Sequence, residues 1–73
     1  MAKACVLIKT TPTETQKILE KVAKMGAVWK VYVAYGRWDI VAFIDAPIEE
    51  ISRISASINS IDGVRSTETL PQA

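Results

Sequence analysis

The sequence predicts an α+β domain in which strands and helices follow the order β-α-β-β-α-β, giving a four-stranded antiparallel sheet with two helices on one face. Three observations predict it. Short apolar runs rich in β-branched residues alternate with two segments whose apolar residues recur every three or four positions. A glycine separates the second and third apolar runs, as in a hairpin. The chain has 73 residues, 49% of them hydrophobic, so residues 1–73 are expected to form a single domain with a small core.

The first strand and the first helix are predicted from an apolar run followed by a helix start. Lys3–Thr10 is short, apolar and β-branched, which is typical of a strand. Thr11 is expected at the N-cap, Pro12 at the first helical position and Glu14 at the third, where the threonine and glutamate side chains can bond each other's backbone amides. Gly26 is expected just past the helix end. The apolar positions of this helix are Ile18, Leu19, Val22 and Met25.

The middle of the chain predicts an antiparallel hairpin. Val28–Tyr35 and Trp38–Asp45 are both rich in strand-forming residues. The two residues between them, Gly36 and Arg37, fit a two-residue turn of type II′, in which the glycine takes a positive φ. We therefore expect the second and third strands to be neighbours in the sheet.

Pro47 marks the start of the second helix. Proline suits the first helical turn, and either Asp45 or Ala46 is expected as the cap before it. Gly63 closes the helix, and the more polar run Val64–Leu70 is the fourth strand. The apolar stripe of this helix, expected in the core, consists of Ile48, Ile51, Ile54, Ile58 and Ile61. Right-handed crossovers then place both helices on one sheet face, which is the ferredoxin-like arrangement.

Both faces of the predicted sheet are apolar, although two helices can cover only one. Successive residues of the first and third strands point to opposite faces, yet both sets are hydrophobic. Roughly six extra apolar side chains of about 50–100 Å² each leave several hundred Å² open. At about 25 cal/mol/Å², covering this area is worth several kcal/mol, so we expect a twofold dimer through the sheet face. The predicted interface residues are Cys5, Leu7, Tyr32, Ala34, Val41 and Phe43.

Charge and composition argue against several functions. Nine Lys and Arg balance eight Asp and Glu for a net charge of +1, so no basic patch predicts direct nucleic-acid binding. The chain has no histidine, no phosphate-binding loop and no paired cysteines, so we expect no metal, no cofactor and no enzymatic activity. No apolar stretch approaches 18 residues, which favours a cytoplasmic protein without a membrane segment. The lone Cys5 is expected to be a small buried hydrophobe.

Asp39, which follows the glycine turn, is the leading candidate for a binding residue. A carboxylate beside a turn can receive an ammonium group, but it can equally cap the turn or pair with Arg37. Trp29 and Trp38 could stack on a planar ligand or pack in an interface. The hydroxyls of the last strand could bind a carboxylate, although threonine is also an ordinary strand residue.

Three segments together resemble the effector-binding domain of the Lrp/AsnC family of transcriptional regulators, also called the RAM domain. They are Lys3–Ile8, Val31–Val41 and Ile61–Thr69. The most specific parts are the Tyr-Gly-x-x-Asp hairpin at 35–39 and, about two dozen residues later, Gly-Val followed by Thr-x-Thr. The resemblance covers residues 3–70. It implies a ferredoxin-like protomer, dimers through the sheet faces, and rings of eight or ten chains. The sequence begins directly at the first strand, without the family's helix-turn-helix, so a stand-alone module is expected.

The resemblance also implies a ligand site and partners. The family binds free amino acids between dimers, and the implied roles are an ammonium bond for Asp39 and exposed backbone groups for Gly36. Arg37-Trp38 stands where an acidic–aromatic pair is commoner in the family, which leaves the identity of the amino acid open. The implied ligand-binding residues are Tyr35, Gly36, Arg37, Trp38, Asp39, Thr67 and Thr69. The implied partners are further copies of the chain, a free amino acid effector and full-length Lrp/AsnC regulators.

Three classes of function compete at this point. The first is an amino-acid-binding regulatory module, which predicts heat on titration with a free amino acid. The second is a small dimeric αβ-barrel enzyme, although such enzymes often use a histidine and this chain has none. Turnover of a small aromatic or quinone substrate would favour it. The third is a structural assembly subunit without a ligand, whose mass and melting temperature would not respond to any amino acid.

Overall fold

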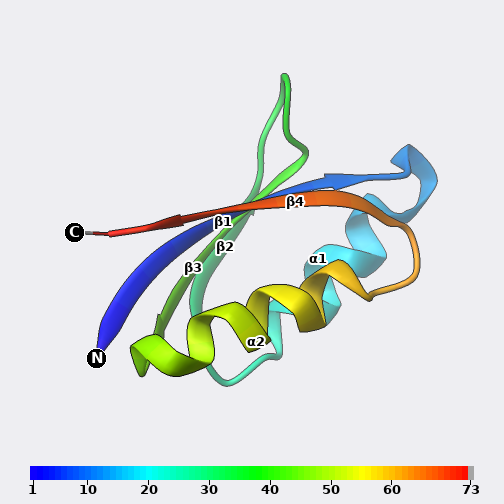
Figure 1. Ribbon diagram of the computed structural model, residues 1–73. Coiled ribbons are helices and arrows are strands. Elements are labelled where there is room, and N and C mark those ends of the chain that lie inside the picture. Colours follow the sequence, from blue (N-terminus) through cyan, green and yellow to red (C-terminus); the bar gives the residue numbers. More distant parts are fainter. Residues whose placement is uncertain (73) are drawn as a thin grey trace.

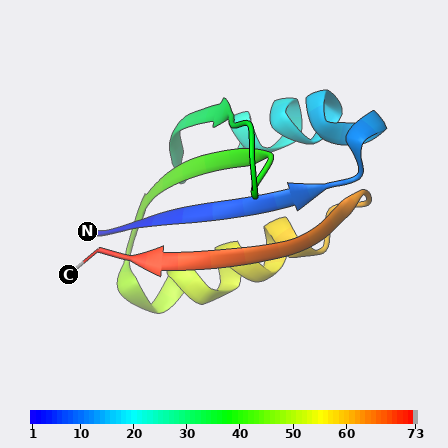
Figure 2. The same cartoon turned by 90° about the horizontal axis from the view of Figure 1, so that it is seen from above.

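The computed structural model describes residues 1–72 and confirms the predicted ferredoxin-like fold. The sheet has four antiparallel strands in the order β2-β3-β1-β4. Both helices lie on one side of it (Figure 1), and Figure 2 shows the sheet from the opposite side. The elements are β1 (Ala2–Thr10), a short 3-10 turn η1 (Pro12–Glu14), α1 (Thr15–Ala23), β2 (Val28–Val33), β3 (Ile40–Ala46), α2 (Ile48–Asn59) and β4 (Val64–Pro71).

The core lies between the sheet and the two helices. Alternate residues of β1 and β3 are buried, because successive side chains on a strand point to opposite faces and one face meets the helices. Leu19, Met25 and Ile61, which the sequence placed on helix stripes, are half-buried against this core. The buried hydrophobic residues are Ala4, Val6, Ile8, Ile18, Val22, Ile40, Ala42, Ile44, Ala46, Ile51, Ile54 and Ile58.

The predicted capping box at the first helix is wrong. The Thr11 side chain makes no capping hydrogen bond, and the Glu14 amide donates instead to the Thr11 backbone carbonyl at 2.8 Å. That bond closes a single 3-10 turn, so α1 begins only at Thr15. Gly26 does not take the left-handed conformation expected past a helix end either, because α1 has already ended at Ala23.

The predicted two-residue hairpin turn is also wrong. The last pair of the β2–β3 ladder is Val33 with Ile40, so the connection has six residues, 34–39. The Asp39 amide donates to the Ile8 carbonyl of β1 at 2.9 Å, while the Asp39 carbonyl accepts from the Ala34 amide at 2.8 Å. The ladder therefore stops short of the glycine, with the Ala34–Asp39 bond as the last backbone link between the two sides of the loop. Gly36 has the expected positive φ, +139°, but within this longer loop.

The second helix starts one residue later than predicted. Pro47 is the N-cap rather than the first helical residue, and Ile48 begins α2. Ile48 is 73% exposed, so the predicted core stripe loses its first member while Ile51, Ile54 and Ile58 are buried. Ile48 lines a hollow between the start of α2, β1 and β4 instead of packing in the core.

Candidate functional site

The β2–β3 loop, residues 34–39, contains five of the implied ligand-binding residues. Tyr35 is 97% exposed, Gly36 and Arg37 are also exposed, and Trp38 and Asp39 are half-buried. Figure 1 shows this loop rising away from the layer that contains both helices. The loop therefore presents an aromatic and a basic side chain to solvent, with a carboxylate at its base.

The Asp39 carboxylate is fixed against the end of β1. Its Oδ2 accepts hydrogen bonds from the Thr10 amide at 2.8 Å and from the Thr10 hydroxyl at 3.3 Å. The same oxygen lies 3.9 Å from the Lys9 ammonium. Asp39 therefore neither caps its own turn nor pairs with Arg37, the two structural roles considered from the sequence. It bonds to Thr10 and pairs with Lys9, both on β1.

The two implied threonines lie apart from the loop, on the side of β4 that faces α2. The Thr69 hydroxyl shares a hydrogen bond with Ser55 at 2.5 Å, and the Thr67 hydroxyl donates to the Asn59 side chain at 3.3 Å. β1 separates β4 from β3, so both hydroxyls are two strand spacings, or about 10 Å, from Asp39 across the sheet. Thr69 is also displaced along the strands, since it pairs with Val6 whereas Asp39 bonds to Ile8 and Thr10. A single chain does not join them into one site.

The second face of the sheet has no helix over it and carries the predicted interface residues. Cross-strand partners share a face, so the register places Tyr32, Val41, Leu7 and Glu68 in one row across the four strands. A second row contains Lys30, Phe43, Cys5 and Leu70. We call this surface, defined by these two rows, the open face. Val41, Phe43, Cys5 and Leu7 are only half-buried, whereas their neighbours on the other face are buried.

The predicted interface set and this surface differ at several positions. Trp29, which is 59% exposed, occupies a β-bulge between Val28 and Lys30 and packs against Phe43 with ring centroids 5.6 Å apart. The interface role considered for Trp29 concerns a second chain and stays a prediction. Leu70 is 46% exposed on β4, where its alternation with Glu68 could have revealed it. Ala34 lies beyond the end of β2, in the loop.

Cys5 is half-buried on the open face rather than fully buried as predicted, and this partial burial raises the pKa of its thiol above the ordinary value of 9.0.

We therefore expect Cys5 to react with iodoacetamide more slowly in the folded protein than in urea, because the thiolate is the reacting species. The contribution of Cys5 to the free energy of unfolding should be lost as the pH rises from the thiol pKa of the unfolded chain through the higher pKa of the folded chain. The unfolded chain releases this proton at the lower pH. The difference in reactivity is checked by alkylation rates of the folded and the urea-unfolded protein from pH 7 to 10, followed by mass spectrometry. Equal rates in folded and unfolded protein would contradict it.

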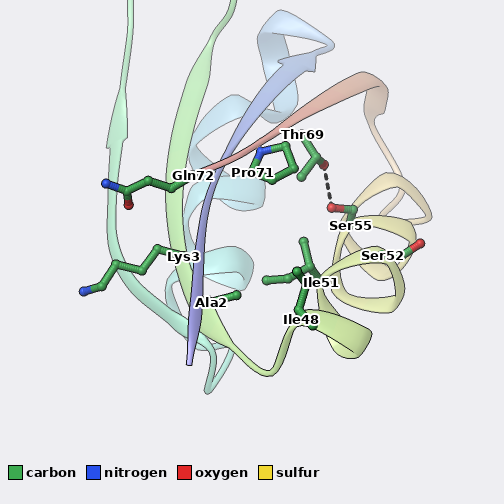
Figure 3. Close-up of a pocket in the computed structure, with 9 residues that line it drawn as sticks. All are labelled: Ala2, Lys3, Ile48, Ile51, Ser52, Ser55, Thr69, Pro71 and Gln72. Atoms are coloured by element: carbon green, nitrogen blue, oxygen red, sulfur yellow. Dashed lines mark hydrogen bonds between the residues drawn. The ribbon is translucent and has the colours of Figure 1, made fainter.

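A hollow of about 340 Å³ lies where β1, β4 and the start of α2 meet. Figure 3 shows Ile48, Ile51 and Ala2 lining it, with the Thr69–Ser55 hydrogen bond at its inner end. Its walls are largely apolar, and Lys3 and Gln72 also contribute to its lining. The hollow is at the opposite end of β1 from Asp39, about six residues or about 20 Å away along the strand.

Two further features bear on function. Within residues 1–72, no three carboxylate or thiol side chains are grouped so that they could hold a metal ion. Over the same residues, neither helix has the length and apolar character needed to cross a membrane.

Comparison with family models places the chain in a known group. The model described as the Lrp/AsnC ligand binding domain matches residues 3–71. A search of curated protein sequences finds no match.

Solved structures show the same fold. TTHA0845 from Thermus thermophilus is 33% identical, with a TM-score of 0.94 over 100% of this chain and 94% of its own. FFRP-DM1 is 23% identical, with a TM-score of 0.93 over 100% of both chains. AsnC from E. coli is 22% identical, with a TM-score of 0.87 over 97% of this chain and 50% of its own. The chain thus corresponds to about half of AsnC.

Proposed function

Because this chain belongs to the Lrp/AsnC ligand-binding domain family, we propose that it is a regulatory module that binds a free amino acid and assembles with copies of itself. The observation that carries the proposal is the family match, which covers residues 3–71 and so nearly the whole chain. The fold shared with AsnC supports the same class of protein. The proposal concerns ligand binding and assembly, and it assigns the chain no reaction.

The open face supports the assembly half of this proposal. It exposes Trp29, Tyr32 and Leu70 beside the half-buried side chains of β1 and β3. A contiguous apolar patch of this kind on a small protein marks an interaction surface. A small core also gains stability from oligomerisation. A second copy, packed sheet to sheet, would cover the patch with a surface of the same kind.

The separation of the loop from the hollow supports an effector site between copies. Asp39 lies at one end of β1, and the hollow that contains Thr69 lies at the other. A loop of a neighbouring dimer can approach that hollow, whereas the chain's own loop cannot. The amino acid would then have its ammonium group at the Asp39 carboxylate of one chain and its remaining groups against a second chain.

Binding between dimers gives the ligand control over assembly. A ligand shifts an equilibrium by its differential affinity for the two states, so an amino acid that binds only the completed site favours the larger ring. A Kd between micromolar and millimolar corresponds to about 4–8 kcal/mol. This is enough to shift the equilibrium from dimers towards a ring of eight or ten chains. Full-length Lrp/AsnC regulators, which share the domain, are candidates for mixed assembly in the cytoplasm.

Isothermal titration with each of the twenty amino acids tests the proposal. We expect at least one of them to bind with a Kd between micromolar and millimolar and to increase the mass measured by light scattering. The variant Asp39→Asn should weaken that affinity by about tenfold or more, since a charged hydrogen bond is worth about 1.5–3 kcal/mol. The asparagine oxygen can still accept from the Thr10 amide, so the loop should keep its position.

The matched control is Glu20→Gln, which removes a carboxylate from an exposed position on α1, outside the loop and the lining of the hollow. This variant should bind the amino acid as the unaltered protein does. No heat with any of the twenty would rule out the ligand half of the proposal. It would leave a structural assembly module, a role that the existing bonds of Asp39 to Thr10 and Lys9 also fit.

A further inference from the structure

The hollow between β1, β4 and the start of α2 leaves apolar surface in contact with solvent. Ile48 lines it and is 73% exposed, although Ile51, in the next turn of α2, is buried. Ala2 of β1 and Pro71 of β4 contribute to its other walls (Figure 3). Apolar surface in a concave site gains free energy when an apolar group covers it. The hollow therefore favours an apolar occupant.

The inner end of the hollow carries two hydroxyl groups whose hydrogen-bonding capacity is only partly used. Ser55 of α2 and Thr69 of β4 bond to each other at 2.5 Å (Figure 3). In such a pair one hydroxyl donates, so the proton of the other hydroxyl is left without an acceptor. Neither side chain makes a further hydrogen bond to residues 1–72. The pair can thus donate one hydrogen bond to a bound molecule and accept another.

Within residues 1–72, the side chains that line the hollow present no charge to its interior. Lys3 contributes to the lining, but its ammonium lies 3.8 Å from the Asp45 carboxylate and 5.9 Å from the centre of the Trp29 ring. Figure 3 shows the side chains of Lys3 and Gln72 directed away from α2. A charged group placed in the hollow would lose its hydration without gaining a partner of opposite charge, which is unfavourable.

The volume of the hollow, about 340 Å³, limits the size of its occupant. An enclosed apolar cavity of about 150 Å³ already holds benzene, and small-molecule sites begin at about 300 Å³. A single ring with a small substituent therefore fits. With the substituent at the hydroxyl pair, the ring lies against the apolar walls.

We infer that the hollow is a binding pocket for an uncharged, ring-sized apolar group that carries one hydroxyl, as a phenol does. The ring contacts Ile48, Ile51 and Ala2, and its hydroxyl exchanges hydrogen bonds with the Ser55–Thr69 pair. Two sources can supply such a group, a free phenol or the side chain of the amino acid effector. The second source rests on the proposed function, and among the twenty amino acids only tyrosine has such a side chain.

Matched probes test the pocket without any amino acid. Phenol, toluene and benzoate share one ring and differ in carrying a hydroxyl, a methyl or a carboxylate. In amide NMR of isotope-labelled protein, phenol and toluene should give saturable shifts at Ala2, Ile51 and Ser55 and none in the loop 34–39. Benzoate should give none, because its charge has no partner in the hollow. Benzoate binding as tight as that of phenol would overturn the assigned chemistry, and the absence of saturable shifts with phenol would overturn the pocket.

The double variant Ser55→Ala/Thr69→Val makes the inner end of the hollow apolar. Replacing both partners of a hydrogen bond by apolar groups of similar shape should preserve the fold. Phenol should then bind about three- to tenfold more weakly, as expected for the loss of a neutral hydrogen bond, whereas toluene should bind as before or more tightly. The matched control, Ser57→Ala at an exposed position on α2, should change neither affinity. An equal loss for phenol and toluene would contradict the bond to the hydroxyl.

Ile48→Asp tests the apolar wall at a position outside the core. The aspartate lies at the start of α2, where the helix dipole favours an acidic side chain, so the fold should be kept. Phenol and toluene should both bind at least about fivefold more weakly, because part of the apolar wall is lost. Unchanged affinity for both probes would show that the ring does not contact this wall, and the pocket would be wrong.

Calorimetric titration with amino acids distinguishes the two sources and separates this inference from the proposed function. Tyrosine should bind more tightly than phenylalanine, and the double variant should remove that difference. If tyrosine has no such advantage although phenol occupies the hollow, a free phenol is the source. If another amino acid binds and phenol does not, the pocket fails and the proposed function is unaffected. If phenol binds in the hollow and none of the twenty gives heat, the proposed function fails and the pocket is supported.

Discussion

A Val41→Asp variant is expected to be a folded monomer. Val41 lies in the middle of the open face, between Tyr32 and Leu7 in the same row. Its side chain points away from the helices, so the aspartate remains hydrated in the single chain. In a sheet-to-sheet dimer it would be buried without a partner, which costs several kcal/mol per carboxylate. Because symmetry doubles the effect, the dimer Kd should rise by at least about a thousandfold.

Sedimentation equilibrium and circular dichroism together check this prediction. The control is Ala56→Glu, which adds the same charge at an exposed position on α2, in the helix layer. That variant should remain a dimer. A Val41→Asp protein that still dimerises would show that the chains meet through another surface, and it would contradict the sheet-face assembly proposed above.

The apolar character of both sheet faces could be predicted from the sequence because it depends only on the alternation of residues along a strand. Val6 and Ile8 are buried against the helices, while Cys5 and Leu7 are on the open face. No tertiary information is needed for that distinction. The same local pattern did not place Trp29 against Phe43, because a β-bulge, which depends on pairing with β3, shifts the register at Trp29.

The hairpin was mispredicted for a related reason. Gly36 and Arg37 have the composition of a short turn, but Asp39 bonds to Ile8 and to Thr10 of β1. Thr10, the nearer of these two in the sequence, precedes Asp39 by 29 residues. Sequence reasoning identified Asp39 as a site candidate and could not identify Thr10 or Lys9 as its partners. Long-range hydrogen bonds of this kind decide where a ladder stops, and local propensity does not contain them.

Gly63→Ala is expected to lower the free energy of unfolding by about 2–5 kcal/mol. Gly63 has φ +96°, where an L-residue is strained by about 1–2 kcal/mol. An added Cβ would also lie 3.0 Å from the Glu14 Cβ and 3.1 Å from the Ile18 Cδ1, and overpacking of this kind costs about 1–3 kcal/mol. The backbone cannot easily move away, because the Gly63 carbonyl accepts from the Thr11 amide at 2.9 Å.

The other two glycines separate strain from crowding in this prediction. Gly36→Ala meets no atom within 4 Å but has φ +139°, so it should show only the strain. Gly26→Ala has neither problem, and it should be neutral or stabilise by up to about 1 kcal/mol by restricting the unfolded chain. Urea unfolding at one fixed protein concentration, followed by tryptophan fluorescence, ranks the three variants. If Gly63→Ala costs no more than Gly36→Ala, the packing of α1 against this turn does not constrain the fold, and strain alone explains the glycine.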